Sequence, residues 1–233
     1  MAKFAFAAPE LPGKDARQVP AYCRANFDAY RASRKRAGIT MERVYLMRTP
    51  MGNFAVAYIE AAGDFPTTLA NFTKGDPFDK GFLDRVRDIH GFDINAAPPG
   101  PPSAVVGDWS DPDVKERRAG LAFMAPLKPG QVEAGGAFAK AAFETRRAEL
   151  TAARRAVGLT REVVCLNYTP MGEVICVYIE GRDPVAGNRG FANSRSPYDK
   201  WFKAECRKIF IDSIDFDQPL PPIEPMMDWS AGT

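Results

Sequence analysis

Apolar and polar positions follow the same course twice along this chain. Each course opens with a short apolar run that ends in proline, at residues 4–9 and again at 121–126, and both runs predict a strand. A long segment with apolar residues at helical spacing follows each run. It stops just before Gly38 in the first course and Gly158 in the second, where a left-handed cap residue is expected.

Two apolar runs joined by Thr-Pro-Met-Gly come next in each course and predict a β-hairpin. The runs cover residues 44–49 and 54–59 in the first course, and 163–169 and 174–179 in the second. The second strands, FAVAYI and VICVYI, lack the alternation of a strand with one wet face. We therefore expect both faces of these strands to be covered, one by the helices of the same course and the other by the second course.

A second helix is predicted to begin at Asp76-Pro77 and at Ser196-Pro197, because each pair supplies an N-cap and a proline in the first turn. A proline-rich stretch then leads into Asp-Trp-Ser in both courses. Proline cannot donate to a sheet, so the last strand is either the short piece before the prolines or the piece that leads into Asp-Trp-Ser; we favour the latter.

The motifs show that the two courses are copies of one unit. Thr-Pro-Met-Gly begins at Thr49 and Thr169, Tyr-Ile-Glu at Tyr58 and Tyr178, and Asp-Trp-Ser at Asp108 and Asp228, always 120 residues apart. This constant spacing predicts a first repeat over residues 1–110, a connector over 111–120 and a second repeat over 121–233.

The element order in each repeat is β-α-β-β-α-β, the ferredoxin-like plan. With its doubly covered strands and its duplication, the chain resembles the dimeric α+β barrel superfamily. The resemblance implies two ferredoxin-like units with antiparallel sheets packed face to face, as a pseudo-dimer within one chain, and it leaves further oligomerisation open. It also implies that a small apolar or aromatic molecule, or haem, binds in the cleft between each sheet and its own helices.

Composition and charge exclude some classes of protein but do not indicate a specific function. The 233 residues are 45% hydrophobic and 26% charged, as in ordinary globular proteins, and a net charge of +2 gives no basic footprint for nucleic acid. No apolar run is long enough for a signal peptide or a membrane span, so a cytoplasmic protein is expected. The four cysteines form no C-x-x-C pair and are read as buried free thiols. With a single histidine, no metal site and no cofactor are predicted.

The resemblance makes the polar and aromatic residues of the cleft the candidate site. The candidates for binding a ligand are Arg48, Tyr58, Trp109, Tyr168, Tyr178 and Trp201. The candidates for catalysis are His90, Glu60 and Glu180. At three of these positions the equivalent residues of the first and second repeat differ: Arg48 and Tyr168, Gly81 and Trp201, and His90 and Phe210.

Each candidate also has an ordinary structural interpretation, which we favour. Glu60 and Glu180 end apolar strands and are expected to be exposed there, whereas burial would raise their pKa for acid or base work. Tyr58 and Tyr178 are expected in the core with locally satisfied hydroxyl groups. His90, the only histidine, is expected to face solvent at a helix end. The arginines of the second amphipathic segment, Arg154 among them, are expected to form a solvated face.

Three functions remain open at this point. The first is a small-molecule-binding protein, with cofactor-independent monooxygenase-like or isomerase-like activity on an apolar or aromatic substrate as its enzymatic form. The alternative is a non-catalytic barrel whose role is association, with its clefts filled by side chains. The third is haem binding through His90. Fold analogy alone does not choose among them.

Overall fold

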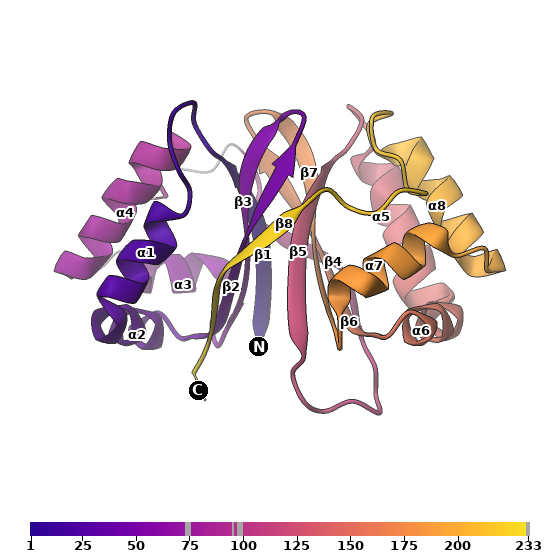
Figure 1. The fold of residues 1–233 in the computed structure, drawn as a ribbon, viewed down its shortest axis with the longest axis horizontal. Helices are drawn as coiled ribbons and strands as arrows, with labels where there is room; N and C mark the ends of the chain where they lie inside the picture. Colours follow the sequence, from indigo (N-terminus) through magenta and orange to yellow (C-terminus); the bar gives the residue numbers. More distant parts are fainter. Residues whose placement is uncertain (73–75, 95, 97–99, 232–233) are drawn as a thin grey trace. The chain divides into compact units, whose positions relative to one another are not determined.

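A computed structural model describes residues 1–72, 76–94, 96 and 100–231, so residues 97–99 of the first proline-rich stretch lie outside it. The chain divides into two compact units, Met1–Ser103 with Pro222–Thr233 (unit 1) and Ala104–Pro221 (unit 2). Each unit has one four-stranded antiparallel sheet with helices on one of its faces (Figure 1). The predicted α+β class with two antiparallel sheets is confirmed.

Unit 1 has the strand order β1-β3-β2-β8. Its strands are β1 (Ala2–Pro9), β2 (Ile39–Thr49), β3 (Gly52–Ala61) and β8 (Ile223–Ser230). Its helices are α1 (Gln18–Ala25), α2 (Phe27–Arg36), α3 (Phe65–Phe72) and α4 (Pro77–His90).

Unit 2 has the matching strand order β4-β6-β7-β5. Its strands are β4 (Ala104–Ser110), β5 (Ala119–Pro126), β6 (Leu159–Thr169) and β7 (Gly172–Gly181). Its helices are α5 (Val132–Lys140), a π-helical turn η1 (Ala141–Thr145), α6 (Arg147–Ala156), α7 (Pro184–Asn193) and α8 (Pro197–Ile209).

The last strand of each repeat completes the sheet of the other repeat. Strand β8 ends the second repeat but pairs with β2, with Arg43 opposite Asp228. Strand β4 ends the first repeat but pairs with β6, with Val163 opposite Asp108. Both strands lead into Asp-Trp-Ser, as we favoured. Neither repeat builds a four-stranded sheet from its own residues, so the compact units and the sequence repeats have different boundaries.

The predicted hairpins are confirmed in both units. Thr49 lies opposite Gly52 and Thr169 opposite Gly172, and the hydroxyl of each threonine donates to the carbonyl oxygen of its partner glycine. Gly52 and Gly172 have φ angles of 122° and 109°, which favour glycine over any residue with a side chain. The turns therefore need the glycine that ends each Thr-Pro-Met-Gly motif.

The amphipathic segments are less regular than predicted. In unit 1 the helix breaks at Asn26, and the break leaves Phe27 exposed, although Phe27 stands at helical spacing from the buried Cys23 and Tyr30. In unit 2 the corresponding region contains the π-helical turn η1. Two short helices, α3 and α7, were not predicted at all, although Asp183-Pro184 supplies an N-cap and a first-turn proline for α7.

The central strands are buried on both faces, as the continuous apolar runs predicted. In β3, Ala55 and Ala61 belong to the core cluster between the sheet and its helices. Val56 and Tyr58 alternate with them on the other face and are also fully buried. How the two sheets pack against each other stays a prediction.

Candidate ligand-binding site

A buried arginine lies between sheet and helices in unit 1. Arg34 on α2 is 1% exposed, and its Nε and Nη2 donate to the two carboxylate oxygens of Glu42 on β2 at 2.5 and 3.2 Å. The hydroxyl of Tyr30 donates to the same carboxylate at 2.9 Å. The guanidinium carbon lies within 4.7 Å of the ring centres of Tyr30, Phe72 and Phe82. Burial by itself lowers the pKa of Arg34, but the charge of Glu42 outweighs it and holds the pKa above its usual value.

Unit 2 repeats this ion pair with different neighbours. Arg154 on α6 is buried, donates to Glu162 on β6 at 2.5 Å and lies 3.4 Å from Asp199 on α8. In unit 1, Asp79 occupies the position of Asp199 but pairs with Arg36 and accepts from Ser33 at 2.5 Å. The expected solvated arginine face is therefore wrong for Arg154, because a carboxylate on the facing strand draws its guanidinium inward.

These networks fill the helix-facing side of both sheets with satisfied polar groups. A carboxylate that already accepts from an arginine fork has little capacity left for a substrate proton. The implied cleft between each sheet and its own helices therefore holds core side chains at these positions. We assign the two ion pairs to the stability of the units.

The tyrosine and glutamate candidates come together as one pair in each unit. The hydroxyl of Tyr58 donates to Glu60 at 2.6 Å, and that of Tyr178 donates to Glu180 at the same distance. The expectation of locally satisfied tyrosine hydroxyls is confirmed. The expectation of exposed glutamates is wrong, because Glu60 and Glu180 are 4% and 1% exposed. Alternation along β3 and β7 places all four side chains on the face away from the helices, not in the implied cleft.

The two glutamates have different surroundings. Arg161 lies opposite Glu180 in the sheet with its Nε 3.5 Å from the carboxylate, and Nε of Arg117 in the connector donates to it at 2.9 Å. At the position of Arg161, unit 1 has Met41 opposite Glu60. Glu180 is thus compensated by two arginines of its own unit. A role of the tyrosines in binding and of the two glutamates in catalysis stays a prediction.

His90 ends α4 and is buried, which corrects the expected solvent-facing position. Its Nδ1 lies 2.8 Å from the carbonyl oxygen of Pro9. Because a carbonyl oxygen can only accept, Nδ1 carries the proton and the neutral ring has its acceptor at Nε2. Burial lowers the pKa of His90, with the hydrogen bond to Pro9 acting in the opposite direction. Haem ligation by His90 stays a prediction.

Arg48 and Tyr168 lie near the hairpin ends of β2 and β6. Arg48 pairs with Glu224 on β8 at 2.7 Å, and both side chains are about two-fifths exposed. Tyr168 is half-buried opposite Glu173. Alternation places both side chains on the helix-facing side of their sheets, in line with Glu42 and Glu162, but at the hairpin ends of the strands.

Trp201 on α8 is half-buried in an aromatic group, with the guanidinium of Arg146 4.0 Å from its ring centre. In unit 1 the equivalent residue is Gly81, and a Cβ there would stand 2.5 Å from the hydroxyl oxygen of Tyr22, so a larger residue would have to displace that ring. The position equivalent to Tyr22 in unit 2 is Ala142. The two helices thus exchange a large and a small residue, and Tyr22 fills in unit 1 the space that Trp201 fills in unit 2.

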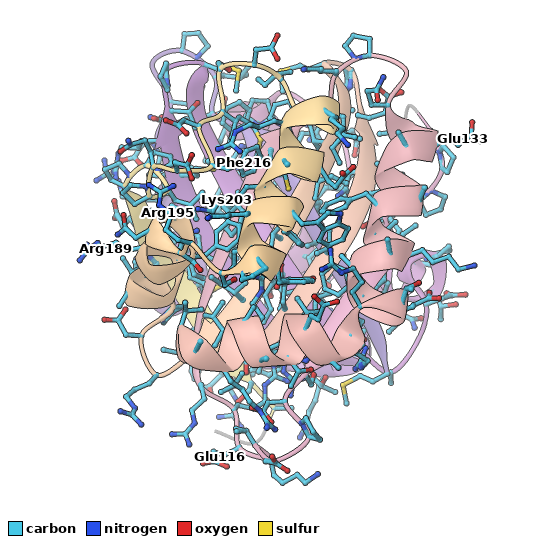
Figure 2. All side chains as sticks on the ribbon, turned by 90° about the vertical axis from the view of Figure 1, so that its right-hand side faces the viewer. Glu116, Glu133, Arg189, Arg195, Lys203 and Phe216 are labelled. Carbon is cyan, nitrogen blue, oxygen red and sulfur yellow. The ribbon has the colours of Figure 1, made fainter. Side chains whose placement is uncertain are left out.

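Lys203 on α8 is a buried cation that the sequence analysis missed. Its Nζ donates to the carbonyl oxygens of Ala192 and Ser194 at 2.6 and 3.1 Å and to Asp217 at 2.9 Å. Figure 2 shows Lys203 beside the segment that carries Arg195, whose side chain is exposed. The three donors of the ammonium group are all used, so Lys203 ties the end of α7 to α8.

An open hollow lies beside Trp109 in unit 2. It has a volume of about 350 Å³. Its lining residues come from β4, the following turn and α6, and are Trp109, Ser110, Pro112, Arg147, Ala148 and Thr151. The indole N–H of Trp109 donates to Thr151 Oγ1 at 2.9 Å, and that hydroxyl donates to the carbonyl oxygen of Arg147. This hollow, here called the Trp109 hollow, brings one predicted site residue together with a cation and two hydroxyl groups.

Metal and thiol chemistry find no support among the described residues. Over that part of the chain, no three histidine, cysteine, aspartate or glutamate side chains lie close enough to hold a metal ion. All four cysteines are free and buried, as predicted. Cys165 and Cys176 lie opposite each other on β6 and β7, and burial raises the pKa of Cys176 well above its usual value. A thiol held protonated in this way is a poor nucleophile.

Comparison with known proteins supports the fold. No protein-family model matches the chain, and no curated protein matches it significantly in sequence. This chain shares its fold with an anthrone oxidase-like protein. The two superpose with a TM-score of 0.56 at 12% identity, over 99% of this chain and 94% of that one. The other protein is therefore also a single chain of similar length.

Two further solved structures resemble the chain more loosely. One is a putative monooxygenase from Fusobacterium nucleatum subsp. nucleatum, with a TM-score of 0.48 at 11% identity over 98% of this chain and 96% of that one. The other is a putative monooxygenase from Lactobacillus acidophilus NCFM, with a TM-score of 0.49 at 11% identity over 97% and 93%. None of the helices in the described part of the chain is long and apolar enough to cross a membrane.

Proposed function

We propose that this chain is a small-molecule-binding protein of the dimeric α+β barrel group, a single-chain fusion of two ferredoxin-like units, with its ligand site at the Trp109 hollow. The hollow carries this proposal: its volume of about 350 Å³ lies in the range of roughly 300 to 1,000 Å³ that is common for ligand sites. Its lining combines the apolar side chains of Pro112 and Ala148, with the buried Trp109 beneath, and a guanidinium and two hydroxyls, the mixture that orients a small ligand.

Binding is better supported than catalysis. None of the side chains that line the hollow is a carboxylate or an imidazole, so the lining supplies no general base. Cofactor-independent oxidation or isomerisation of an apolar or aromatic substrate is the enzymatic form of the proposal. Its support is the shared fold with the anthrone oxidase-like protein. Glu60, Glu180 and His90 remain its candidate acids and bases.

The test fills the hollow from α6. Ala148 is exposed and lines it, so Ala148→Trp should fold normally and occupy the space. Ala152 is also exposed on α6 but does not line the hollow, and Ala152→Trp is the matched control. Native mass spectrometry against a panel of aromatic compounds should show binding that Ala148→Trp abolishes and Ala152→Trp retains. Binding that both variants retain would place the ligand elsewhere.

The non-catalytic alternative keeps one specific support. The helix-facing sides of both sheets hold core residues and satisfied ion pairs, as expected for a protein whose role is association. Absence of binding to any compound of the panel would favour this alternative. Haem binding is tested separately, because added haem should give an absorbance band that His90→Ala removes.

A further inference from the structure

Arg147 is held in the wall of the Trp109 hollow by only one of its nitrogens. Its Nη1 donates to the carbonyl oxygens of Asp108 and Phe143, both at 3.2 Å. Within the described part of the chain, Nε and Nη2 make no hydrogen bond, and no carboxylate lies within ion-pair distance of the guanidinium. Arg147 is thus an anchored, uncompensated cation with three N–H donors left over.

These free donors match one chemical group better than others. Nε and Nη2 of a guanidinium form a planar fork that pairs with both oxygens of a carboxylate. Anchoring through Nη1 restricts the side chain beforehand, so less rotamer freedom is lost when the fork is filled. The hydroxyl of Thr151 already accepts from Trp109 and donates to a carbonyl oxygen, which leaves the fork and the hydroxyl of Ser110 as the polar contacts of the hollow.

Unit 1 does not repeat this arrangement. The positions equivalent to Arg147 and Ala148 are Phe27 and Asp28. Phenylalanine cannot pair with an anion, and a nearby aspartate repels one. Selection for an anion is therefore confined to unit 2, although both units carry the tryptophan.

We propose that the Trp109 hollow binds small molecules that carry a carboxylate on an apolar or aromatic body, with the carboxylate on Nε and Nη2 of Arg147. The body lies against Pro112 and Ala148, which are the exposed apolar residues of the lining, above the fully buried Trp109. This inference names the ligand class of the proposed function and rests on it. A carboxylate at this position forms two charge-assisted hydrogen bonds that a neutral analogue of the same shape cannot form.

The experiment compares naphthalene-2-carboxylate with naphthalene-2-carboxamide in titrations followed by the indole N–H resonance of Trp109. The full chain is used, with Arg147→Gln as the test variant and Arg189→Gln as the control. Arg189 lies on α7 and is labelled in Figure 2. It is not among the lining residues, so the control removes the same charge from outside the hollow.

We expect the carboxylate to bind more tightly than the carboxamide. Arg147→Gln should weaken binding of the carboxylate about 10- to 100-fold and leave the carboxamide unchanged. Arg189→Gln should change neither. Arg147→Lys, which keeps the charge without the fork, should fall between the wild type and Arg147→Gln.

Failure of the inference and failure of the proposed function look different. Equal affinities for both probes, with Arg147→Gln unchanged, would overturn carboxylate recognition and leave a ligand site at the hollow. No shift of the Trp109 resonance with either probe, while the thermal unfolding of the protein shows it folded, would overturn both.

Discussion

The two units build the same sheet and the same buried ion pair, but they surround them differently. Both arginines lie against aromatic rings, Arg34 against three and Arg154 against Phe191 and Phe202, but in unit 1 Asp79 has a second arginine of its own. In unit 2, Arg154 serves both Glu162 and Asp199. The parts that the units share hold the fold together, and the parts that differ identify where a function confined to one unit lies. Arg147 in the wall of the hollow is one of these differences.

The largest expected effect comes from removing residues 222–233. Strand β8 belongs to the second repeat, yet Met226 and Trp229 pack in the core of unit 1. Loss of a buried tryptophan alone costs about 3 to 5 kcal/mol, and the truncation also exposes the edge of β2. Hydrogen exchange with mass spectrometry should show β1, β2 and β3 losing protection while β5, β6 and β7 keep theirs. The reverse pattern would show that the last strand supports its own repeat.

The next largest effect is a difference in stability between variants of the two buried arginines. Arg154→Met leaves both Glu162 and Asp199 without a cation, whereas after Arg34→Met only Glu42 loses its partner. Breaking a buried pair costs about 3 to 5 kcal/mol of unfolding free energy. The loss in Arg154→Met should therefore be at or above the upper end of this range, and the loss in Arg34→Met should be smaller. Urea unfolding measures both.

A double replacement gives the control for this comparison. Arg34→Met with Glu42→Met removes both charges and should recover much of the loss, because an apolar pair needs no compensation. Equal losses in the two single variants would mean that Asp199 does not depend on Arg154.

The buried ion pairs are features that the sequence did not predict, in contrast to the caps and turns. The caps at Asp76 and Ser196, the hairpin turns and the doubly covered strands were predictable, because each depends on residues close together in the chain. Burial of Arg34 and Arg154 was not, because it depends on a carboxylate eight residues further along the chain, on the facing strand. An arginine at a helix surface and one paired beneath it have the same local pattern.

The strand exchange was unpredictable for a related reason. Both repeats end in Asp-Trp-Ser, so the two possible last strands have the same local sequence pattern. That pattern therefore does not indicate which of the two last strands pairs with a given central strand. The hollow depends on this choice, since it brings Trp109 from the first repeat against Arg147 and Thr151 from the second. Trp109 was a candidate on sequence, whereas its two neighbours were not.

A smaller effect is expected at the paired tryptophans. Trp109 donates to Thr151, whereas the indole nitrogen of Trp229 is buried without a hydrogen-bond partner in the described residues. Trp109→Phe loses a hydrogen bond worth about 1 kcal/mol, whereas Trp229→Phe removes a donor that already lacks a partner. Urea unfolding should therefore show Trp109→Phe to be the more destabilising by about 1 kcal/mol. A larger loss in Trp229→Phe would point to an acceptor for its indole.

The smallest effect is a pH dependence at His90. Its folded-state pKa lies below the unfolded value near 6.5, so the unfolded chain binds the proton more readily. Stability should therefore fall as the pH drops below about 6.5, by up to about 1.4 kcal/mol for each pH unit until the folded-state pKa is reached. His90→Phe, which installs the residue of unit 2, should lose this contribution. Urea midpoints at pH 7.5 and 5.5 for both proteins measure it, and equal acid sensitivity would contradict a buried neutral imidazole.

The central claim is that each repeat completes the sheet of the other, which also builds the hollow in unit 2. Backbone nuclear Overhauser effects between neighbouring strands test it most directly in the intact chain. The structure predicts contacts between β2 and β8 in the register of Arg43 with Asp228, and between β6 and β4 in the register of Val163 with Asp108. Backbone contacts of β2 with β4 and of β6 with β8 in place of these would show that each repeat keeps its own last strand, and would contradict the account.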